Sequence, residues 1–346
     1  MALSKDFYPP RHSLARLPTP LQFLERASSK WGCGKRLWLK RDDLTGTVLT
    51  GNKVRKLEFL VGHALLHGYD ALITCGGVHS NHCRATAFVA AQMGWPCELV
   101  LRGAEPQPGG NHLLDQLAGA ELTHIEPALY SRNLDSILEQ RAERWRARGH
   151  KPLVIPTGGS DAIGLWGYIA ACEEIKGDCE KLEIDSPVIV SATGSGGTQA
   201  GLTAGSIVHK FHAPVKGYAV CDNRDYFNNK VCADYASARS VYPQLPDINL
   251  SPDTCDDYIG SGYGLASDAV YQRIAELARL EGIVLDPVYT GKAFFGLCAD
   301  LRAGVYADSS DIIFVHTGGI FGIFPHGDRL RGASQLREPS LVRGLS

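Results

Sequence analysis

Three cations occupy the start of a predicted helix in the segment LTGNKVRKLEFL: Lys53, Arg55 and Lys56. Asn52 is a suitable N-cap, and apolar residues recur behind it at helical spacing, so Lys53 falls in the first helical turn. The helix dipole is positive at this end, and together with the neighbouring cations it would lower the pKa of the Lys53 amine. A neutral amine of this kind suits Schiff-base chemistry. The alternative interpretation is the solvated basic face of a surface helix.

A second loop, TCGGVHSNHCRATA, follows the predicted strand ALITC and leads into another helix. Ser80 and Asn81 lie at this helix start, where their side chains and free backbone N–H groups can bind an anion such as a substrate carboxylate. An ordinary N-cap without a ligand is the alternative. The spacing of four possible metal ligands matches no common zinc motif, so no metal site is predicted from Cys75, His79, His82 and Cys83.

A third loop, SATGSGGTQAGLTAG, contains five glycines after an apolar strand. Its backbone can wrap a phosphate, and the following helix points its N-terminus at the same place. The loop lacks a Walker lysine and a GxGxxG pattern, so a single phosphate monoester fits better than ATP or a dinucleotide. A glycine-rich turn without a ligand is the alternative. The candidate phosphate ligands are Gly194, Ser195, Gly196, Gly197 and Thr198.

These loops belong to a chain in which short β-rich runs alternate with longer amphipathic or alanine-rich segments. Strands are predicted at residues 71–75, 97–101, 152–156, 187–194 and 311–319. The alternation indicates an α/β fold with mainly parallel sheets flanked by helices. Ligands of such folds bind where strands end and helices begin, which is where the three loops lie.

The domain organisation is predicted to be discontinuous. No internal repeat, low-complexity segment or Pro/Gly/Ser linker separates a first half from a second. Residues 53–161 read as a compact set of βα units, inserted into a larger domain formed by residues 1–52 and 162–346.

Composition limits the possible partners. The 346 residues are 44% hydrophobic, and 35 Lys and Arg balance 37 Asp and Glu, which favours a small-molecule partner over nucleic acid or an acidic membrane. Ten cysteines without a CxxC pair indicate a reducing compartment. The N-terminal segment lacks a signal-peptide core, and no apolar run is long enough to span a bilayer, so a cytoplasmic protein is expected.

An imine-forming lysine, a carboxylate-binding helix start and a phosphate loop together describe a pyridoxal-phosphate enzyme that acts on an amino acid. From about Leu17 to Phe324 the chain resembles the D-cysteine desulfhydrase and 1-aminocyclopropane-1-carboxylate deaminase family. The matching motifs are KRDDLTGTVLTGNKVRKLEFL, GGVHSNHCRATA, SATGSGGTQAGL, GYGLAS, LEGIVLDPVYTGKAFFGL and FVHTGG. The resemblance implies the tryptophan-synthase-β-like fold type II, with the cofactor between two lobes, and a homodimer.

The resemblance also assigns cofactor ligands. Lys53 would carry pyridoxal 5'-phosphate as a Schiff base, Asn81 would hydrogen-bond its phenolic oxygen, and residues 194–198 would hold its phosphate. Tyr289 would lie against the ring or the reacting centre, and Thr290 would hydrogen-bond the pyridine nitrogen. A hydroxyl there cannot balance a pyridinium charge. The cyclopropane-opening deaminases resemble one another in having Glu at this position, so Thr290 looks like the desulfhydrase branch.

Substrate contacts follow in the same way. Ser80 would bind the substrate carboxylate, with Asn81 and Tyr263 close to the substrate. For Tyr263 and Tyr289, simple core packing is the alternative. His79 stands where much of the family has glutamine, so it either reads a substrate group or hydrogen-bonds loop backbone. Two segments, residues 102–112 and IFGIFPHGD, depart from the family pattern and are expected to border the pocket.

The expected reaction is β-elimination from D-cysteine to pyruvate, ammonia and sulfide, in which Lys53 or a neighbour removes the α-proton. One alternative is ring-opening deamination of 1-aminocyclopropane-1-carboxylate to 2-oxobutyrate. Another is β-elimination from a related amino acid such as cysteate or β-chloroalanine. Outside this class, a nucleotide-dependent oxidoreductase and a catalytically silent binding protein remain alternatives.

Overall fold

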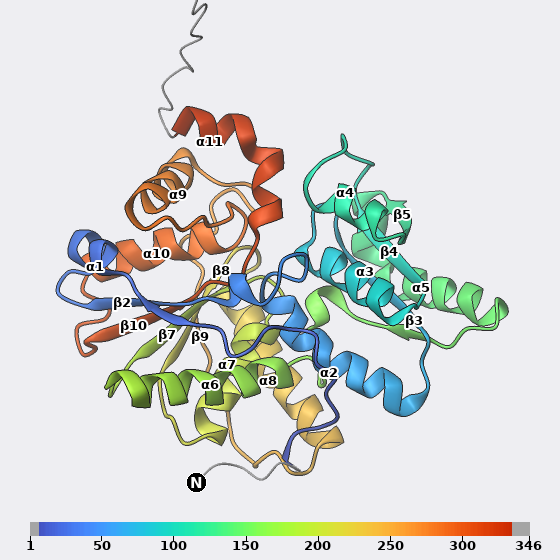
Figure 1. The fold of residues 1–346 in the computed structure, drawn as a ribbon, viewed down its shortest axis with the longest axis horizontal. Helices are drawn as coiled ribbons and strands as arrows, with labels where there is room; N and C mark the ends of the chain where they lie inside the picture. The colour runs from blue at the N-terminus through green and yellow to red at the C-terminus, as the bar shows by residue number, and fades with distance from the viewer. Residues whose placement is uncertain (1–6, 334–346) are drawn as a thin grey trace, which may run out of the picture.

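The computed structural model describes residues 7–333, which form two separate sheets (Figure 1). The larger sheet has the strand order β1-β2-β10-β7-β8-β9. Its β1 strand pairs antiparallel with β2, and the other pairings are parallel. In chain order the strands are Leu21–Phe23 (β1), Arg36–Lys40 (β2), Val188–Thr193 (β7), Val215–Ala219 (β8), Asp253–Cys255 (β9) and Asp311–Val315 (β10).

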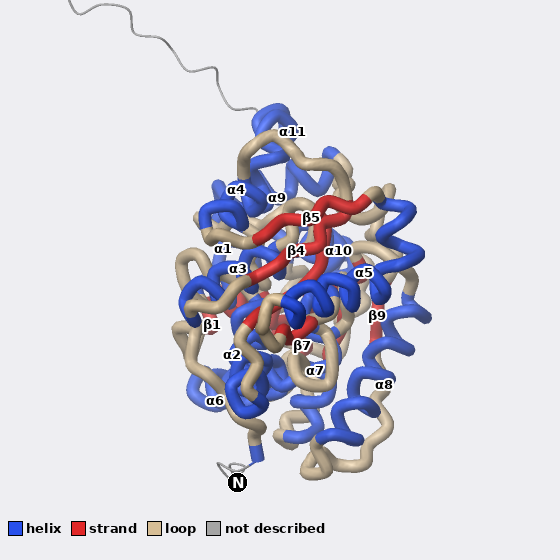
Figure 2. The backbone as a smooth tube through the Cα atoms, turned by 90° about the vertical axis from the view of Figure 1, so that its right-hand side faces the viewer, coloured by secondary structure: helices blue, strands red, loops and turns tan. Residues whose placement is uncertain are grey.

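The smaller sheet has the order β5-β4-β3-β6, and all of its pairings are parallel. Figure 2, in which this part of the molecule faces the viewer, shows β4 and β5 side by side. Its strands come from one stretch of chain, whereas those of the larger sheet come from both sides of that stretch. They are Ala71–Gly77 (β3), Cys97–Arg102 (β4), Glu121–Ile125 (β5) and Pro152–Val154 (β6).

The predicted α/β class with mainly parallel sheets is confirmed, and each of the five predicted strands is present. The last of them ends at Val315, because Gly318 and Gly319 adopt positive φ angles of 87° and 105° and turn the chain. Among the described residues, β1, β5, β8 and β9 were not predicted. All four are short, and polar residues or glycine interrupt their hydrophobic pattern.

Helices cover both faces of the larger sheet. In Figure 1, α1, α9 and α10 lie on one side and α6, α7 and α8 on the other. Buried residues of α1, α9 and α10 pack on one face of the sheet, and those of α6 and α7 pack on the opposite face. The bounds are Glu25–Trp31 (α1), Trp166–Leu182 (α6), Gly197–Val208 (α7), Arg224–Val241 (α8), Asp268–Glu281 (α9), Thr290–Arg302 (α10) and Gly327–Ala333 (α11).

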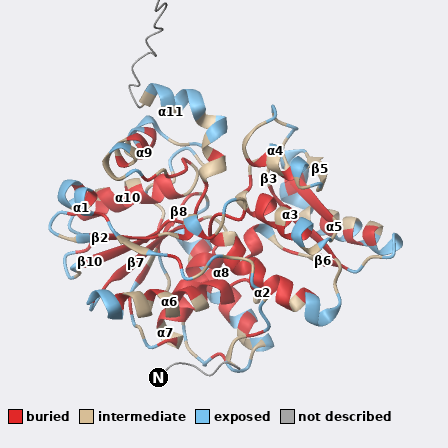
Figure 3. Ribbon diagram, viewed as in Figure 1, coloured by how far each residue is buried: buried red, intermediate tan, exposed pale blue. Residues whose placement is uncertain are grey.

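The smaller sheet is also covered on both faces. Leu72 of β3 faces α2 and α3, while its neighbour Ile73 faces α5, as the alternation of side chains along a strand requires. Figure 3 shows most strands of the two sheets in red, as buried, and α11 largely exposed. The bounds are Asn52–His67 (α2), Asn81–Met93 (α3), Gly110–Leu117 (α4) and Pro127–Ala147 (α5).

A buried ion cluster fixes the start of α2 against the larger sheet and α6. The Arg55 guanidinium donates to Asp42 at 2.7 and 2.9 Å and to Glu174 at 3.0 Å. Arg55 is 2% exposed and Asp42 is fully buried. Tyr168 donates a further hydrogen bond of 2.6 Å to Asp42. The interpretation of this segment as a solvated basic face is therefore wrong, because its cations found buried partners distant in sequence.

Removing Asp42 should destabilise the protein strongly. Asp42→Ala leaves the Arg55 charge buried with three of its five hydrogen bonds to described residues, and we expect a loss of about 3–5 kcal/mol in the free energy of unfolding. The matched control is Glu139→Ala, which removes an exposed ion pair with Arg146 and should cost less than about 1 kcal/mol. Denaturant unfolding measures both, and similar losses in the two variants would contradict this role of Asp42.

Candidate active site

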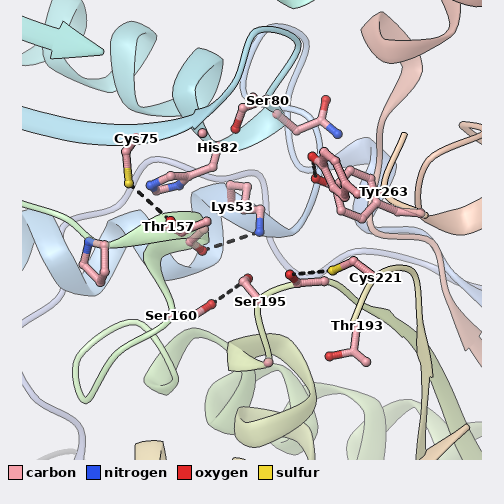
Figure 4. Close-up of a pocket in the computed structure, with 18 of the residues that line it drawn as sticks. Lys53, Cys75, Ser80, His82, Thr157, Ser160, Thr193, Ser195, Cys221 and Tyr263 are labelled. Atoms are coloured by element: carbon pink, nitrogen blue, oxygen red, sulfur yellow. Dashed lines mark hydrogen bonds between the residues drawn. The ribbon is translucent and has the colours of Figure 1, made fainter. Parts of the chain in front are cut away.

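A cavity of about 560 Å³ lies between the two sheets, at the carboxyl ends of their strands. The start of α2, the loop after β3 and the loop after β7 line it, together with residues 156–160. Figure 4 shows Lys53 pointing into this space, between Ser80 on one side and Ser195 on the other. The three loops that were predicted from the sequence to carry chemistry therefore meet around one cavity.

The Lys53 amine lies in the cavity, and no carboxylate within residues 7–333 pairs with it. Its Nζ atom lies 3.4 Å from the carbonyl oxygen of Gly158. Burial lowers the pKa of Lys53 to about 8, and the nearby Cys83 thiol opposes this shift weakly. The predicted direction of the shift is the one found. Its cause is desolvation rather than the neighbouring cations, because Arg55 points away to Asp42.

Lys56 is a site residue that the sequence did not assign. It lies one helical turn after Lys53 on the same face of α2 and is 1% exposed. Its amine donates to Ser160 Oγ at 3.0 Å and to the Gly158 carbonyl at 3.2 Å. Burial, and then the charge of Lys53, lower its pKa well below the usual value. A bound anion would stabilise the charged form of Lys56. The i, i+3 spacing of Lys53 and Lys56 is the sequence feature that could have indicated this residue.

The loop before α7 leaves a cradle for such an anion. A Cβ atom on Gly197 would come within 2.5 Å of Ser160 Oγ and 2.8 Å of Lys56 Nζ, so only glycine keeps this space open. Ser195 Oγ lies 2.8 Å from Ser160 Oγ, and Asn52 donates to Thr198 Oγ1 at 2.9 Å. Gly194, Ser195, Gly196 and Thr198 line the cavity, and Gly197 lies just behind them. These groups fit a phosphate monoester at the start of a helix.

The start of α3 presents Ser80 and Asn81 on the opposite wall. Ser80 is the N-cap, and its Oγ accepts from the backbone N–H of Cys83 at 3.2 Å. Asn81 Oδ1 accepts from Asn111 Nδ2 at 2.9 Å, and the same Nδ2 donates to the His79 carbonyl at 2.8 Å. Because Asn111 takes the carbonyl side of the Asn81 amide, the N–H side is left for the cavity. Asn111 is fully buried, and only its place in the atypical segment 102–112 hinted at this position.

Two tyrosines close the wall between the cavity and its neighbour. The hydroxyls of Tyr263 and Tyr289 are hydrogen-bonded, and their ring centroids lie 5.8 Å apart at 74°. Both residues line the 560 Å³ cavity and a second cavity of about 310 Å³ beside it. Burial raises the pKa of both hydroxyls, so both carry their protons at neutral pH. The two tyrosines therefore line the same cavity as Lys53.

The position of Thr290 differs from the one that the sequence predicted. It is fully buried and lies outside the cavity lining, because its Oγ1 donates to Asp286 Oδ1 at 2.7 Å and accepts from the Asp286 N–H at 2.9 Å. The predicted contact of Thr290 with a cofactor ring is therefore not supported. Thr317, in the HTGG turn, does line the cavity, and its hydroxyl was missed because no strand or helix pattern marks that turn.

The histidines have separate surroundings. His79 lines the second cavity together with His326. Burial is the main cause that lowers the pKa of His79, and the charges of His112 and His326 lower it further. His82 is buried and lies 2.8 Å from Thr74 Oγ1. Within residues 7–333 no group of three or more His, Cys, Asp or Glu side chains is placed to hold a metal ion.

The fold and the cavity define an enzyme site for an anion-bearing cofactor beside a reactive amine, and comparison with known proteins agrees. The chain belongs to the family described as pyridoxal-phosphate-dependent enzymes, whose model matches residues 12–318. Pyridoxal phosphate is thus its cofactor, as the sequence predicted. No helix among the described residues is long and apolar enough to cross a membrane.

Individual relatives within this family carry names that refer to two activities. The chain is 41% identical to a Klebsiella pneumoniae protein named D-cysteine desulfhydrase, over 92% of this chain and 97% of the relative. It is 42% identical to a Thermotoga maritima protein named provisionally as a 1-aminocyclopropane-1-carboxylate deaminase, over 92% of this chain and 99% of the relative. A crystal structure described as an ACC deaminase homologue superposes with a TM-score of 0.86 at 40% identity, covering 94% and 96% of the two chains.

The pH dependence of imine formation tests the Lys53 amine. Since burial lowers the pKa of Lys53 to about 8, its neutral fraction grows tenfold per pH unit below pH 8 and then levels off. We expect the rate at which the cofactor-free protein forms its imine absorbance with pyridoxal phosphate to follow this curve. Lys53→Ala should form no such absorbance. A rate that keeps rising beyond pH 9.5 would show an ordinary, solvated amine instead.

Asn111 should control the amide of Asn81. In Asn111→Ala the Asn81 amide loses its fixed orientation, and we expect pyridoxal phosphate to bind roughly 3- to 10-fold more weakly, with a shifted absorbance maximum. Asn111→Asp should have a larger effect, because a carboxylate would accept from the Asn81 N–H and turn the amide around. Gln116→Ala, on the exposed side of α4, is the control. Spectra of Asn111→Ala and Asn111→Asp that match the control would contradict this positioning role.

Proposed function

We propose that the protein catalyses β-elimination from a small β-substituted amino acid, with D-cysteine as the first candidate and pyruvate, ammonia and sulfide as products. The observation that carries the proposal is the Lys53 amine, whose pKa is lowered to about 8, in one cavity with a carboxylate-binding helix start and a phosphate cradle. Relatives named D-cysteine desulfhydrase support the substrate.

The chain's own residues would hold the cofactor as follows. Lys56, Ser195 and the N–H groups at the start of α7 bind the phosphate, and the free N–H side of the Asn81 amide meets the phenolic oxygen. Thr317, which lines the cavity, would supply a hydroxyl to the cofactor ring in place of Thr290. Bound pyridoxal phosphate supplies the electron sink that stabilises negative charge on the substrate's Cα.

The residues proposed to bind the substrate lie on the cavity wall opposite the phosphate cradle. Ser80 and the N-terminus of α3 bind the α-carboxylate, which orients the Cα–H bond toward Lys53. The neutral Lys53 amine then accepts the α-proton. The hydroxyls of Tyr263 and Tyr289, whose pKa values are raised, keep their protons and can donate to the departing β-substituent. His79 lines the second cavity, which these tyrosines also line.

β-Elimination is preferred to ring opening of the cyclopropane for an electrostatic reason. A pyridinium needs a carboxylate partner, and Asp286, the cavity-lining carboxylate at the start of α10, is already saturated. It accepts hydrogen bonds from Val288 N, Tyr289 N, Thr290 N and Thr290 Oγ1. Expulsion of thiolate needs less delocalisation of the Cα charge than opening of a cyclopropane. The provisional deaminase names among relatives keep 1-aminocyclopropane-1-carboxylate as the second candidate.

Two further proposals concern the setting. All ten cysteines are free, and seven of them are buried and none is paired, which supports a reducing compartment such as the cytoplasm. A homodimer is proposed from the family resemblance, and sedimentation of the purified protein tests it.

Product analysis tests the reaction. We expect the cofactor-loaded protein to release pyruvate and sulfide in equal amounts from D-cysteine, more slowly from L-cysteine, and little 2-oxobutyrate from 1-aminocyclopropane-1-carboxylate. Lys53→Ala should lower kcat at least about 10³-fold, because the proton acceptor is lost. Release of 2-oxobutyrate from the cyclopropane at the same rate as pyruvate from D-cysteine would overturn the preference for elimination.

A further inference from the structure

Arg102 is a cation of the site with no anion assigned to it. It ends β4 and lines both the 560 Å³ cavity and the 310 Å³ cavity beside it. Its guanidinium lies over the ring of Tyr263 at 5.3 Å and over that of Tyr130 at 5.8 Å. Among residues 7–333, no carboxylate forms an ion pair with it, and no side-chain hydrogen bond is made by its N–H groups.

Several other arginines of the same lobe form ion pairs with carboxylates. Arg141 and Arg144 meet the buried Glu98, and Arg148 meets Glu121. Arg148 also lies over an aromatic ring, that of Trp145, at 4.8 Å, so stacking on a ring does not prevent pairing. Arg102 differs from these three arginines because it lines two cavities and forms no ion pair among residues 7–333.

The two ring contacts hold Arg102 in a position from which it can bind an oxyanion. A guanidinium is planar and keeps its N–H groups in one plane, where they form a rigid fork. This fork matches two oxygens of a carboxylate, sulfonate or phosphate, and the resulting charge-assisted hydrogen bonds are strong. A thiol or a small apolar group would leave these donors unused.

The position of Arg102 identifies which part of a substrate would carry the oxyanion. Its partner ring, Tyr263, is hydrogen-bonded to Tyr289, and this pair faces the β-substituent in the proposed function. The α-carboxylate is assigned to Ser80 and the start of α3. A second anion beside the tyrosine pair therefore belongs on the β-carbon.

We propose that Arg102 extends the site to amino acids whose β-substituent is an oxyanion that can leave, with the sulfonate of cysteate as the representative. The proposal rests on the proposed β-elimination. The Cα–H bond breaks with its proton passing to Lys53, and the Cβ–S bond breaks with its electron pair leaving on sulfur. One water is consumed, and pyruvate, ammonium and bisulfite are released, so no external oxidant or reductant is required.

The test compares cysteate with cysteine of the same handedness in the cofactor-loaded protein. Wild type, Arg102→Gln, Arg102→Lys and the control Arg148→Gln are assayed for sulfite, sulfide and pyruvate. We expect the ratio of kcat/KM for cysteate to that for cysteine to fall about 10- to 100-fold in Arg102→Gln. Arg102→Lys should fall less, since its charge remains without the fork. Arg148→Gln should keep the wild-type ratio.

Two results would overturn the proposal while leaving the proposed function intact. One is a wild type that releases sulfide from cysteine but no sulfite from cysteate, and the other is an unchanged ratio in Arg102→Gln. If neither amino acid is turned over, the proposed elimination fails, and calorimetry of cysteate binding decides the role of Arg102 separately. Binding at least tenfold weaker in Arg102→Gln supports recognition of the oxyanion, and equal binding overturns it.

Discussion

The site depends on an amine that is kept out of water. Lys53 sits at the start of α2, where burial between the two sheets lowers its pKa to about 8. The same helix start carries two more cations, and each has a different environment. Arg55 points back into an ion cluster with Asp42 and Glu174, which anchors the helix, while Lys56 points forward to Ser160 and the phosphate cradle. One short sequence therefore supplies the anchor, the reactive amine and a candidate phosphate ligand.

The sequence predicted the parts of this arrangement that depend on local pattern. Strand–loop–helix order located all three loops, and the carboxyl ends of parallel strands brought them together. It also predicted the lowered pKa of Lys53, but for the wrong reason. The dominant cause is desolvation, which arises from the packing of segments far apart in the chain and leaves no mark in the local sequence.

The errors have the same origin. Thr290 was expected at the cofactor because of its place in the DPVYTGK motif, but four hydrogen bonds between Asp286 and the start of α10 turn its hydroxyl away. Asn111 and Arg102 come from a segment whose sequence departs from the family pattern. Their roles depend on partners across the cavity, Asn81 and Tyr263, and a hydrogen bond or a ring contact between distant segments is visible only in three dimensions.

The two walls of the cavity divide the chemistry. In the proposed function the cofactor contacts lie on α2, in the loop before α7, in the HTGG turn and at Asn81, whereas the substrate contacts lie at Ser80 and the tyrosine pair. The central claim is that Lys53, and not the more deeply buried Lys56 one turn away, bonds the cofactor. Mass spectrometry of peptides from the borohydride-reduced holoprotein measures this directly. The account predicts a single pyridoxyl adduct on Lys53, and an adduct on Lys56 or on neither lysine would contradict it.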